Sequence, residues 1–75
     1  MTDEIGRYLD LVGRMWARDP GQREGQVFYN ALRTGWPGLE LEIRGTELDP
    51  FTLDQRLPAF LAWVERRLAA PREPG

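Results

Sequence analysis

The chain of 75 residues contains no cysteine, no histidine and no lysine. Without cysteine it can form neither a disulfide nor a thiolate metal site. The lack of histidine and lysine removes the commonest general base, the Schiff-base amine and the lysine of a phosphate-binding loop. Acid–base or metal-assisted chemistry would therefore have to rely on carboxylates.

Acidic residues are concentrated in the middle of the chain, at Glu40, Glu42, Glu47, Asp49 and Asp54. A hydrolytic or divalent-metal site would need two or three of these carboxylates to converge in a cleft. A helical domain of this size rarely has such a cleft, so we expect a solvated acidic surface and helix caps instead. The sequence predicts no enzymatic activity, no cofactor and no metal site.

The ten basic residues are all arginine, and twelve acidic residues bring the net charge to −2. A general nucleic-acid-binding protein needs a basic surface, which this balance does not favour. No apolar run approaches the roughly 20 residues of a membrane span, and the acidic start MTDEIGRY differs from the basic start of a signal peptide. We expect a cytoplasmic protein with no membrane partner.

Residues 1–70 are expected to form a single helical domain, and residues 71–75, which are rich in proline and charge, a disordered tail. A domain of this size buries only about 60% of the surface that its unfolded chain exposes. Three Trp, three Phe and two Tyr are expected to strengthen the core by aromatic packing. A homodimer interface would be the other reinforcement.

Apolar residues recur with helical spacing along residues 3–18, and Thr2 is the predicted N-cap. Gly6, Gly13 and Ala17 lie beside this apolar stripe. Small residues there either permit close packing against another helix or are simply tolerated.

A second helix is predicted to begin at the Asp19-Pro20 pair, which supplies an N-cap and a first-turn proline. It is expected to run to about Thr34, with Gly35 as a left-handed C-terminal cap. Tyr29 is placed at the edge of its apolar side.

Pro37 and Gly45 are expected to bound a short third helix. The alternation of Leu39, Leu41 and Ile43 also fits a short strand. We favour the helix, because a proline opens the segment and no partner strand is evident.

A last helical stripe covers residues 53–68, with Pro58 in its first turns and Trp63 at its margin. The helix begins either at Pro58 or with a kinked turn that Asp49 caps and Pro50 opens. The segment RGTELDPF at 44–51 then forms a corner between helices. The predicted fold class is all-α, a compact bundle of four short helices.

One stripe on the outward face of the first helix carries Arg7, Leu11, Arg14 and Arg18. A single exposed leucine needs no explanation, but an apolar centre framed by arginines is also typical of a small protein interface. We therefore predict a protein-binding module that acts as an adaptor, an inhibitor or a regulatory subunit. A homodimer remains open.

The rival hypothesis is a nucleic-acid-binding helical domain that uses the same arginine-lined face. Residues 27–36 followed by a short helix superficially match a helix-turn-helix motif. The would-be recognition helix carries Glu40 and Glu42, which would repel phosphates. Nucleic-acid binding is therefore the less favoured reading.

Roughly residues 23–64 contain a series of short segments: Gly25-Gln26, Asn30-Ala31-Leu32, Pro37, Ile43-Arg44-Gly45-Thr46, Asp49-Pro50-Phe51, Leu57-Pro58-Ala59-Phe60-Leu61 and Trp63-Val64. In this combination the chain resembles small helical proteins of GC-rich bacteria and their phages. The resemblance implies no catalytic or binding residue and no activity. For a phage-borne protein it implies modulation of a host enzyme or defence component.

Overall fold

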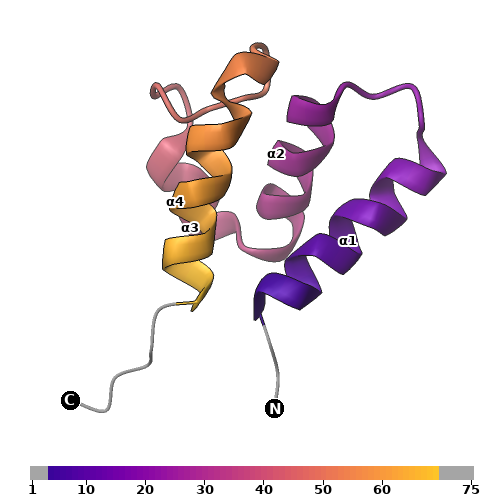
Figure 1. Ribbon diagram of the computed structural model, residues 1–75, viewed down its shortest axis with the longest axis horizontal. Helices are drawn as coiled ribbons and strands as arrows, with labels where there is room; N and C mark the ends of the chain where they lie inside the picture. The colour runs from indigo at the N-terminus through magenta and orange to yellow at the C-terminus, as the bar shows by residue number, and fades with distance from the viewer. Residues whose placement is uncertain (1–3, 70–75) are drawn as a thin grey trace.

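The computed structural model describes residues 4–69, and within them the chain is entirely helical apart from its connections. The elements are α1 (Glu4–Arg18), α2 (Glu24–Gly35), α3 (Pro37–Ile43), a short 3-10 helix η1 (Asp54–Arg56) and α4 (Leu57–Ala69) (Figure 1). The predicted all-α bundle of four short helices is confirmed. The predicted N-cap Thr2 and the predicted tail 71–75 lie outside the described residues.

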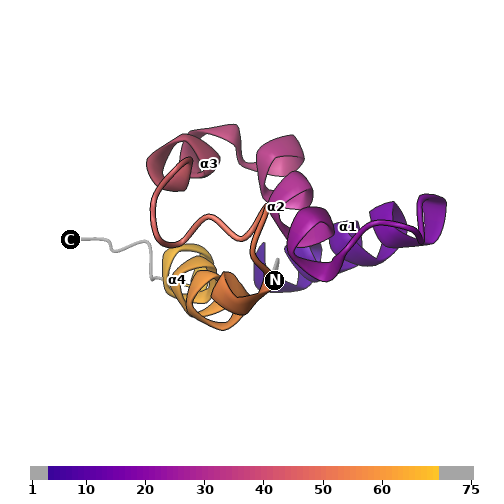
Figure 2. The ribbon, with the colours of Figure 1, turned by 90° about the horizontal axis from the view of Figure 1, so that it is seen from above.

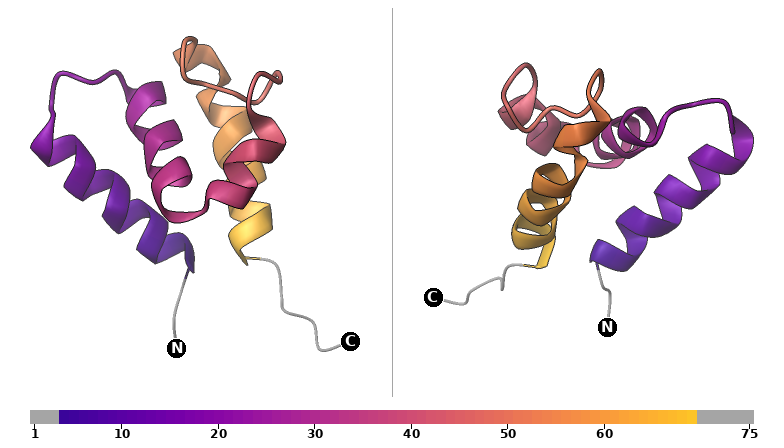
Figure 3. Two further views of the ribbon diagram at one scale, coloured as in Figure 1. Left: turned by 180° about the vertical axis from the view of Figure 1, so that it is seen from behind. Right: turned by 45° about the horizontal axis from the view of Figure 1, so that its top comes forward.

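The central element is α2, which packs against α1 on one side and against α3 and η1 on the other. α1 runs antiparallel to α2; the two helices converge where α1 begins and α2 ends, and they diverge toward their connection (Figures 1 and 3). Seen from above, α1 and α3 extend on opposite sides of α2 (Figure 2). The start of α1 therefore lies next to the corner between α2 and α3.

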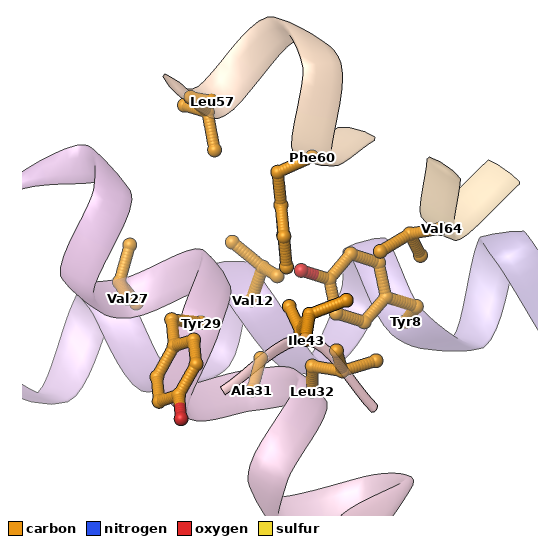
Figure 4. Packing of buried hydrophobic residues seen from close by; sticks show 10 residues of the cluster. All are labelled: Tyr8, Val12, Val27, Tyr29, Ala31, Leu32, Ile43, Leu57, Phe60 and Val64. Atoms are coloured by element: carbon orange, nitrogen blue, oxygen red, sulfur yellow. The ribbon is translucent and has the colours of Figure 1, made fainter. Parts of the chain in front are cut away.

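Within residues 4–69, ten buried hydrophobic residues form one core, to which all four helices contribute: Tyr8, Val12, Val27, Tyr29, Ala31, Leu32, Ile43, Leu57, Phe60 and Val64. Phe60 points from α4 into the middle of this cluster (Figure 4). The predicted aromatic packing is present: the ring of Tyr8 lies 6.2 Å from that of Phe28 and 5.8 Å from that of Trp36. The hydroxyl of Tyr8 donates to the carbonyl oxygen of Phe28 at 2.6 Å, which satisfies its buried polar atom. Burial raises the pKa of this phenol above its usual range.

The small residues of α1 do not mark a close helix contact. Gly6, Gly13 and Ala17 are all exposed, and a Cβ added at Gly13 would meet no atom within 4 Å. At Gly13 the glycine is therefore tolerated, which was the alternative to tight packing.

The prediction for the start of α2 was wrong. Asp19-Pro20 forms a turn after α1, and the backbone N–H of Asp19 still donates to the carbonyl oxygen of Met15 at 3.1 Å. The N-cap of α2 is Arg23, whose backbone N–H donates to Oε1 of Gln26 at 3.2 Å. The Gln26 side chain thus makes one of the two contacts of a capping box, whereas the Arg23 side chain donates to Asp54 and to the carbonyl oxygen of Phe51.

The predicted cap at the end of α2 was also wrong. Gly35 is the last residue of the helix, and the cap is Trp36, whose backbone N–H donates to the carbonyl oxygen of Leu32 at 2.7 Å. Among the described glycines, Gly45 has a positive φ, +77°, and Gly35 does not. Trp36 is at once the C-cap of α2 and the N-cap of α3, and Pro37 occupies the first position of α3, so α3 starts without an intervening loop.

The segment 37–43 is helical, which settles the choice between helix and strand. Pro37 occupies the first position of α3, and Gly45 lies just beyond its end in the left-handed conformation. Leu39 and Ile43 face the core, whereas Leu41, which fitted the helical stripe poorly, is 62% exposed. Both ends of α3 thus follow from local chemistry.

The left-handed conformation of Gly45 leads to a direct prediction. A non-glycine residue there costs about 1–2 kcal/mol, and a β-branched one is the worst fit. A Cβ at this position would have no neighbour within 4 Å, so the cost comes from the backbone alone. We expect Gly45→Val to lower the free energy of unfolding by at least about 1 kcal/mol in urea titrations. Gly45→Asn, which tolerates this conformation, is the matched control and should lose less.

The corner at 44–53 is organised by Asp49, but not as a helix cap. Its Oδ2 accepts from the backbone N–H of Gly45 and its Oδ1 from that of Phe51, both at 2.9 Å. Pro50 is buried and does not open a helix. Regular structure resumes only at η1, and α4 begins at Leu57, one residue before Pro58. The prediction of a kinked helical turn that starts at Pro50 was therefore wrong. The alternative prediction, that the last helix begins near Pro58, is confirmed.

Among residues 4–69, no helix combines the length and the apolar character that are needed to cross a membrane.

Candidate interaction surface

Three of the four predicted interface residues line one groove. Arg7, Leu11 and Arg14 share a face of α1 because they are spaced four and three residues apart. This face borders the corner between α2 and α3, and the resulting hollow has a volume of about 240 Å³. We call it the α1 groove; it is lined by Arg7, Asp10, Leu11, Arg14, Gly35 and Trp36. The fourth predicted residue, Arg18, is exposed further along α1 and does not line the groove.

Leu11 forms the floor of the groove and is not an isolated surface leucine. It is half-buried and packs against the core. Its Cδ2 atom lies 3.4 Å from the position that a Cβ on Gly35 would occupy. The sequence pattern placed Leu11 opposite the buried face, whereas the end of α2 covers part of it. The leucine that α1 exposes most is Leu9, at 50%.

Trp36 forms the wall of the groove and is held from several directions. Its ring meets the edge of the Tyr8 ring, with centroids 5.8 Å apart, and its Nε1–H donates to Oε1 of Glu4 at 3.2 Å. Its backbone caps the end of α2 and the start of α3. Gly35 and Trp36 were not predicted from the sequence as site residues; the available signal was a tryptophan directly before a proline at a helix corner.

The charges around the groove are balanced, because Arg7 and Arg14 lie near two carboxylates, Asp10 in the lining and Glu4 on the indole of Trp36. Arg14 pairs with Asp10 at 2.9 Å, but both side chains are more than half exposed, and such a surface pair contributes only about 0–1 kcal/mol. Neither Arg7 nor Arg18 has a carboxylate partner within residues 4–69. Two cations of the α1 face therefore remain available on a chain whose net charge is −2.

Among residues 4–69, the most buried charged residue is Glu40, which is 1% exposed and lies away from the groove. Nε of Arg44 donates to its Oε2 at 2.7 Å, and Nη2 donates to its Oε1 at 2.9 Å. The hydroxyl of Tyr29 also donates to Oε2. The expected place of Glu40 on a solvated acidic surface was therefore wrong.

Hydrogen bonds and burial shift the pKa values of Glu40 and Tyr29 in opposite directions. The Arg44 guanidinium, and then the Tyr29 hydroxyl, hold the pKa of the Glu40 carboxyl below its usual range against the effect of burial. Burial, followed by the adjacent carboxylate, raises the pKa of Tyr29. Every polar side-chain atom that is fully buried in the described part of the chain has a partner, so the cluster is a satisfied structural network.

The other carboxylates of the predicted acidic cluster are dispersed. Glu42 forms a bidentate ion pair with Arg67 of α4. Asp54 accepts from Nη1 of Arg23 at 3.1 Å and from the backbone N–H of Gly25 at 3.0 Å. Within residues 4–69, no three His, Cys, Asp or Glu residues are placed so as to hold a metal ion.

The two aromatic residues that the sequence placed at the margins of their helices differ in position. Tyr29 is 5% exposed and belongs to the core. Trp63 is half-buried, and the guanidinium carbon of Arg67 lies 5.2 Å from its ring centroid. Arg67 also pairs with Glu42 of α3, and Trp63 does not line the α1 groove.

A second hollow, of about 250 Å³, is lined by Tyr29, Arg33, Asp49, Phe51 and Thr52. Both hollows are smaller than the roughly 300–1,000 Å³ that is usual for small-molecule sites. Each has room for a side chain or a few small groups.

Comparison with known proteins gave no match: no protein family, no curated protein and no solved structure is significantly similar to this chain.

Proposed function

We propose that the protein is a protein–protein interaction module that binds its partner through the α1 groove and acts as an adaptor, an inhibitor or a regulatory subunit. The observation that carries this proposal is the combination of Leu11 as floor, Trp36 as wall and Arg7 and Arg14 as rim. Tryptophan and arginine are the residues most enriched among binding hot spots. An apolar centre inside a polar rim is the usual anatomy of such an interface.

We further propose that the protein is not an enzyme and uses no cofactor. In support, two carboxylates of the acidic cluster are engaged in structural contacts: Glu40 with Arg44 and Tyr29, and Glu42 with Arg67. The hollows are also small for a substrate.

Nucleic-acid binding is the second candidate, because Arg7 and Arg18 of α1 have no carboxylate partner within residues 4–69. A recognition helix is not available for it, since α3 is seven residues long and its Glu40 and Glu42 are held in ion pairs. Binding would therefore depend on phosphates alone and would be strongly sensitive to salt. A filter-binding titration at low salt that detects no complex removes this candidate.

The proposed function predicts the behaviour of surface variants in affinity capture from the native host. We expect the double variant Arg7→Ala/Arg14→Ala to recover at least about tenfold less of the specific partner, because truncated hot-spot arginines cost 2 kcal/mol or more. Arg66→Ala removes an exposed arginine of α4 that has no partner within residues 4–69, so it is the matched control. Circular dichroism should show that all variants remain folded.

Recovery of the same partner in equal amounts with the wild-type protein and the double variant would show that the α1 groove is not the binding surface.

A further inference from the structure

The helix pairings of the fold leave α3 at the edge of the bundle. α1 packs against α2 and α4, and η1 packs against the same two helices. These four elements therefore form a closed ring of contacts that does not include α3. Within residues 4–69, the extensive contacts of α3 are with α2, and Figure 2 shows α3 on the side of α2 that faces away from α1. α3 can thus leave the bundle without breaking this ring.

The buried polar link between α3 and α2 is the carboxylate of Glu40. This residue is 1% exposed, and it accepts from the hydroxyl of Tyr29 in α2. The same carboxylate accepts from the guanidinium of Arg44, at 2.7 Å and 2.9 Å. The polar attachment of α3 to α2 therefore depends on a group whose charge changes with pH.

The other contacts of α3 respond less to acid or not at all. Glu42 pairs with Arg67 of α4, but both side chains are close to half exposed, and a pair of this kind contributes little to stability. Leu39 and Ile43 pack against the core through apolar atoms, so their contribution does not depend on protonation. Apolar packing holds α3 in place at every pH, and Glu40 adds the part that acid can remove.

The charged groups around Glu40 come from the end of α3, from α2 and from the corner at 44–53. Arg44 is the main cause that holds the pKa of the Glu40 carboxyl below its usual range. From α2, the hydroxyl of Tyr29 and the charge of Arg33 act in the same direction, whereas burial opposes them. Asp49 of the corner faces Tyr29 and raises the pKa of that phenol. The stabilisation that Glu40 supplies is therefore lost as the pH falls through its folded-state pKa.

We propose that α3 is an acid-sensitive element, which separates from α2 when Glu40 takes up a proton while α1, α2, η1 and α4 stay packed together. A hydrogen bond to a charged group is roughly twice as strong as one between neutral groups, so protonation weakens the link to Arg44. Arg44 is more than half exposed, and its guanidinium turns to solvent when the carboxylate no longer holds it. The opening is local and does not depend on which partner the α1 groove binds.

The test is amide hydrogen exchange of the ¹⁵N-labelled full chain, followed by NMR between about pH 6 and about pH 3. Protection factors are corrected for the intrinsic pH dependence of exchange, so they report the opening of each helix. We expect the amides of Ile43 and Arg44 to lose at least about tenfold more protection than those of Val12 and Leu32, because a hydrogen bond to a charged group contributes more than that factor.

Glu40→Gln tests whether Glu40 is the group that titrates. The glutamine cannot take up the proton, so α3 should already be poorly protected at about pH 6. The difference in protection between α3 and α1 should then stay nearly constant as the pH falls. Glu47→Gln changes an exposed carboxylate; it is the matched control and should keep the pH response of the wild type.

Arg44→Ala tests the same link from its other side, and the exposure of Arg44 makes this variant the milder one. Without the guanidinium the pKa of Glu40 rises. The midpoint of the α3 transition should therefore move to higher pH, by about one unit or more. Arg66→Ala removes an exposed arginine of α4 and should leave the midpoint unchanged.

Equal loss of protection in α1 and α3 of the wild type would overturn the inference, because the domain would then unfold as one unit. No loss in α3 would overturn it as well. A full pH response of α3 in Glu40→Gln would assign the transition to another carboxylate, and an unchanged midpoint in Arg44→Ala would separate it from the Glu40 link. If Glu40→Gln does not fold, the wild type and Arg44→Ala decide the question by themselves.

Discussion

Replacing Gly25 with alanine should lower the free energy of unfolding by about 2–3 kcal/mol, although alanine is the better helix former. A Cβ on Gly25 would lie 2.3 Å from the carbonyl oxygen of Pro50 and 2.6 Å from Oδ1 of Asp54. Real Cβ atoms do not approach other atoms so closely, so the loop must move away from α2. That movement also weakens the hydrogen bond from the backbone N–H of Gly25 to Asp54.

The expected loss is large for a domain of this size, whose core supplies on the order of 3–5 kcal/mol. Gly13→Ala is the matched control, because it makes the same change inside α1 where no atom lies within 4 Å. It should stabilise the protein by about 0.5–1 kcal/mol. The two variants therefore shift the midpoint of urea unfolding in opposite directions. A Gly25→Ala protein as stable as Gly13→Ala would show that the contact between α2 and the Pro50 corner does not form.

Replacing Glu40 with alanine should cost about 2 kcal/mol of unfolding free energy. The substitution leaves the buried hydroxyl of Tyr29 without its acceptor and removes packing atoms from the core. Arg44 is more than half exposed, so it can be solvated, and the cost stays below that of breaking a fully buried ion pair. Glu47→Ala removes an exposed carboxylate and should change stability by less than about 0.5 kcal/mol.

The same carboxylate makes stability depend on pH. The folded-state pKa of Glu40 lies below its usual range, chiefly because of Arg44. Its contribution is therefore fully present above the unfolded-state pKa of about 4.3 and is lost as the pH falls through the folded-state pKa. Between about pH 6 and about pH 3, the wild type should lose more unfolding free energy than Glu40→Gln. Parallel curves for the two proteins would mean that Glu40 is not held as an anion in the fold.

Local chemistry accounts for most of the elements that the sequence predicted. The periodicity of α1 and α4, the proline at the start of α3 and the left-handed Gly45 all act within a few residues of the chain. The predicted start of α2 was wrong because two helix-start signals lie close together in the sequence. Asp19-Pro20 is a good helix start in isolation, but the helix begins a few residues later, where the Gln26 side chain accepts from the backbone N–H of Arg23.

The candidate site was predictable only in part. The helical spacing of Arg7, Leu11 and Arg14 follows from the sequence, because residues three and four apart share a helix face. That the groove also contains Gly35 and Trp36 depends on how α1 crosses the end of α2. This crossing brings together residues more than twenty positions apart, which no local pattern records.

The sequence by itself determined that the protein is a small all-α domain without thiol, imidazole or amine side chains for catalysis. It also determined that one face of the first helix carries arginines around a leucine. Only the tertiary structure decided that Leu11 is the floor of a groove, that Glu40 is buried and that Gly25 must be glycine. The physical reason is the same in each case. The exposure of a residue and the space around it depend on the residue that packs against it from another segment of the chain. For these residues the neighbours are Gly35, Tyr29 and Pro50.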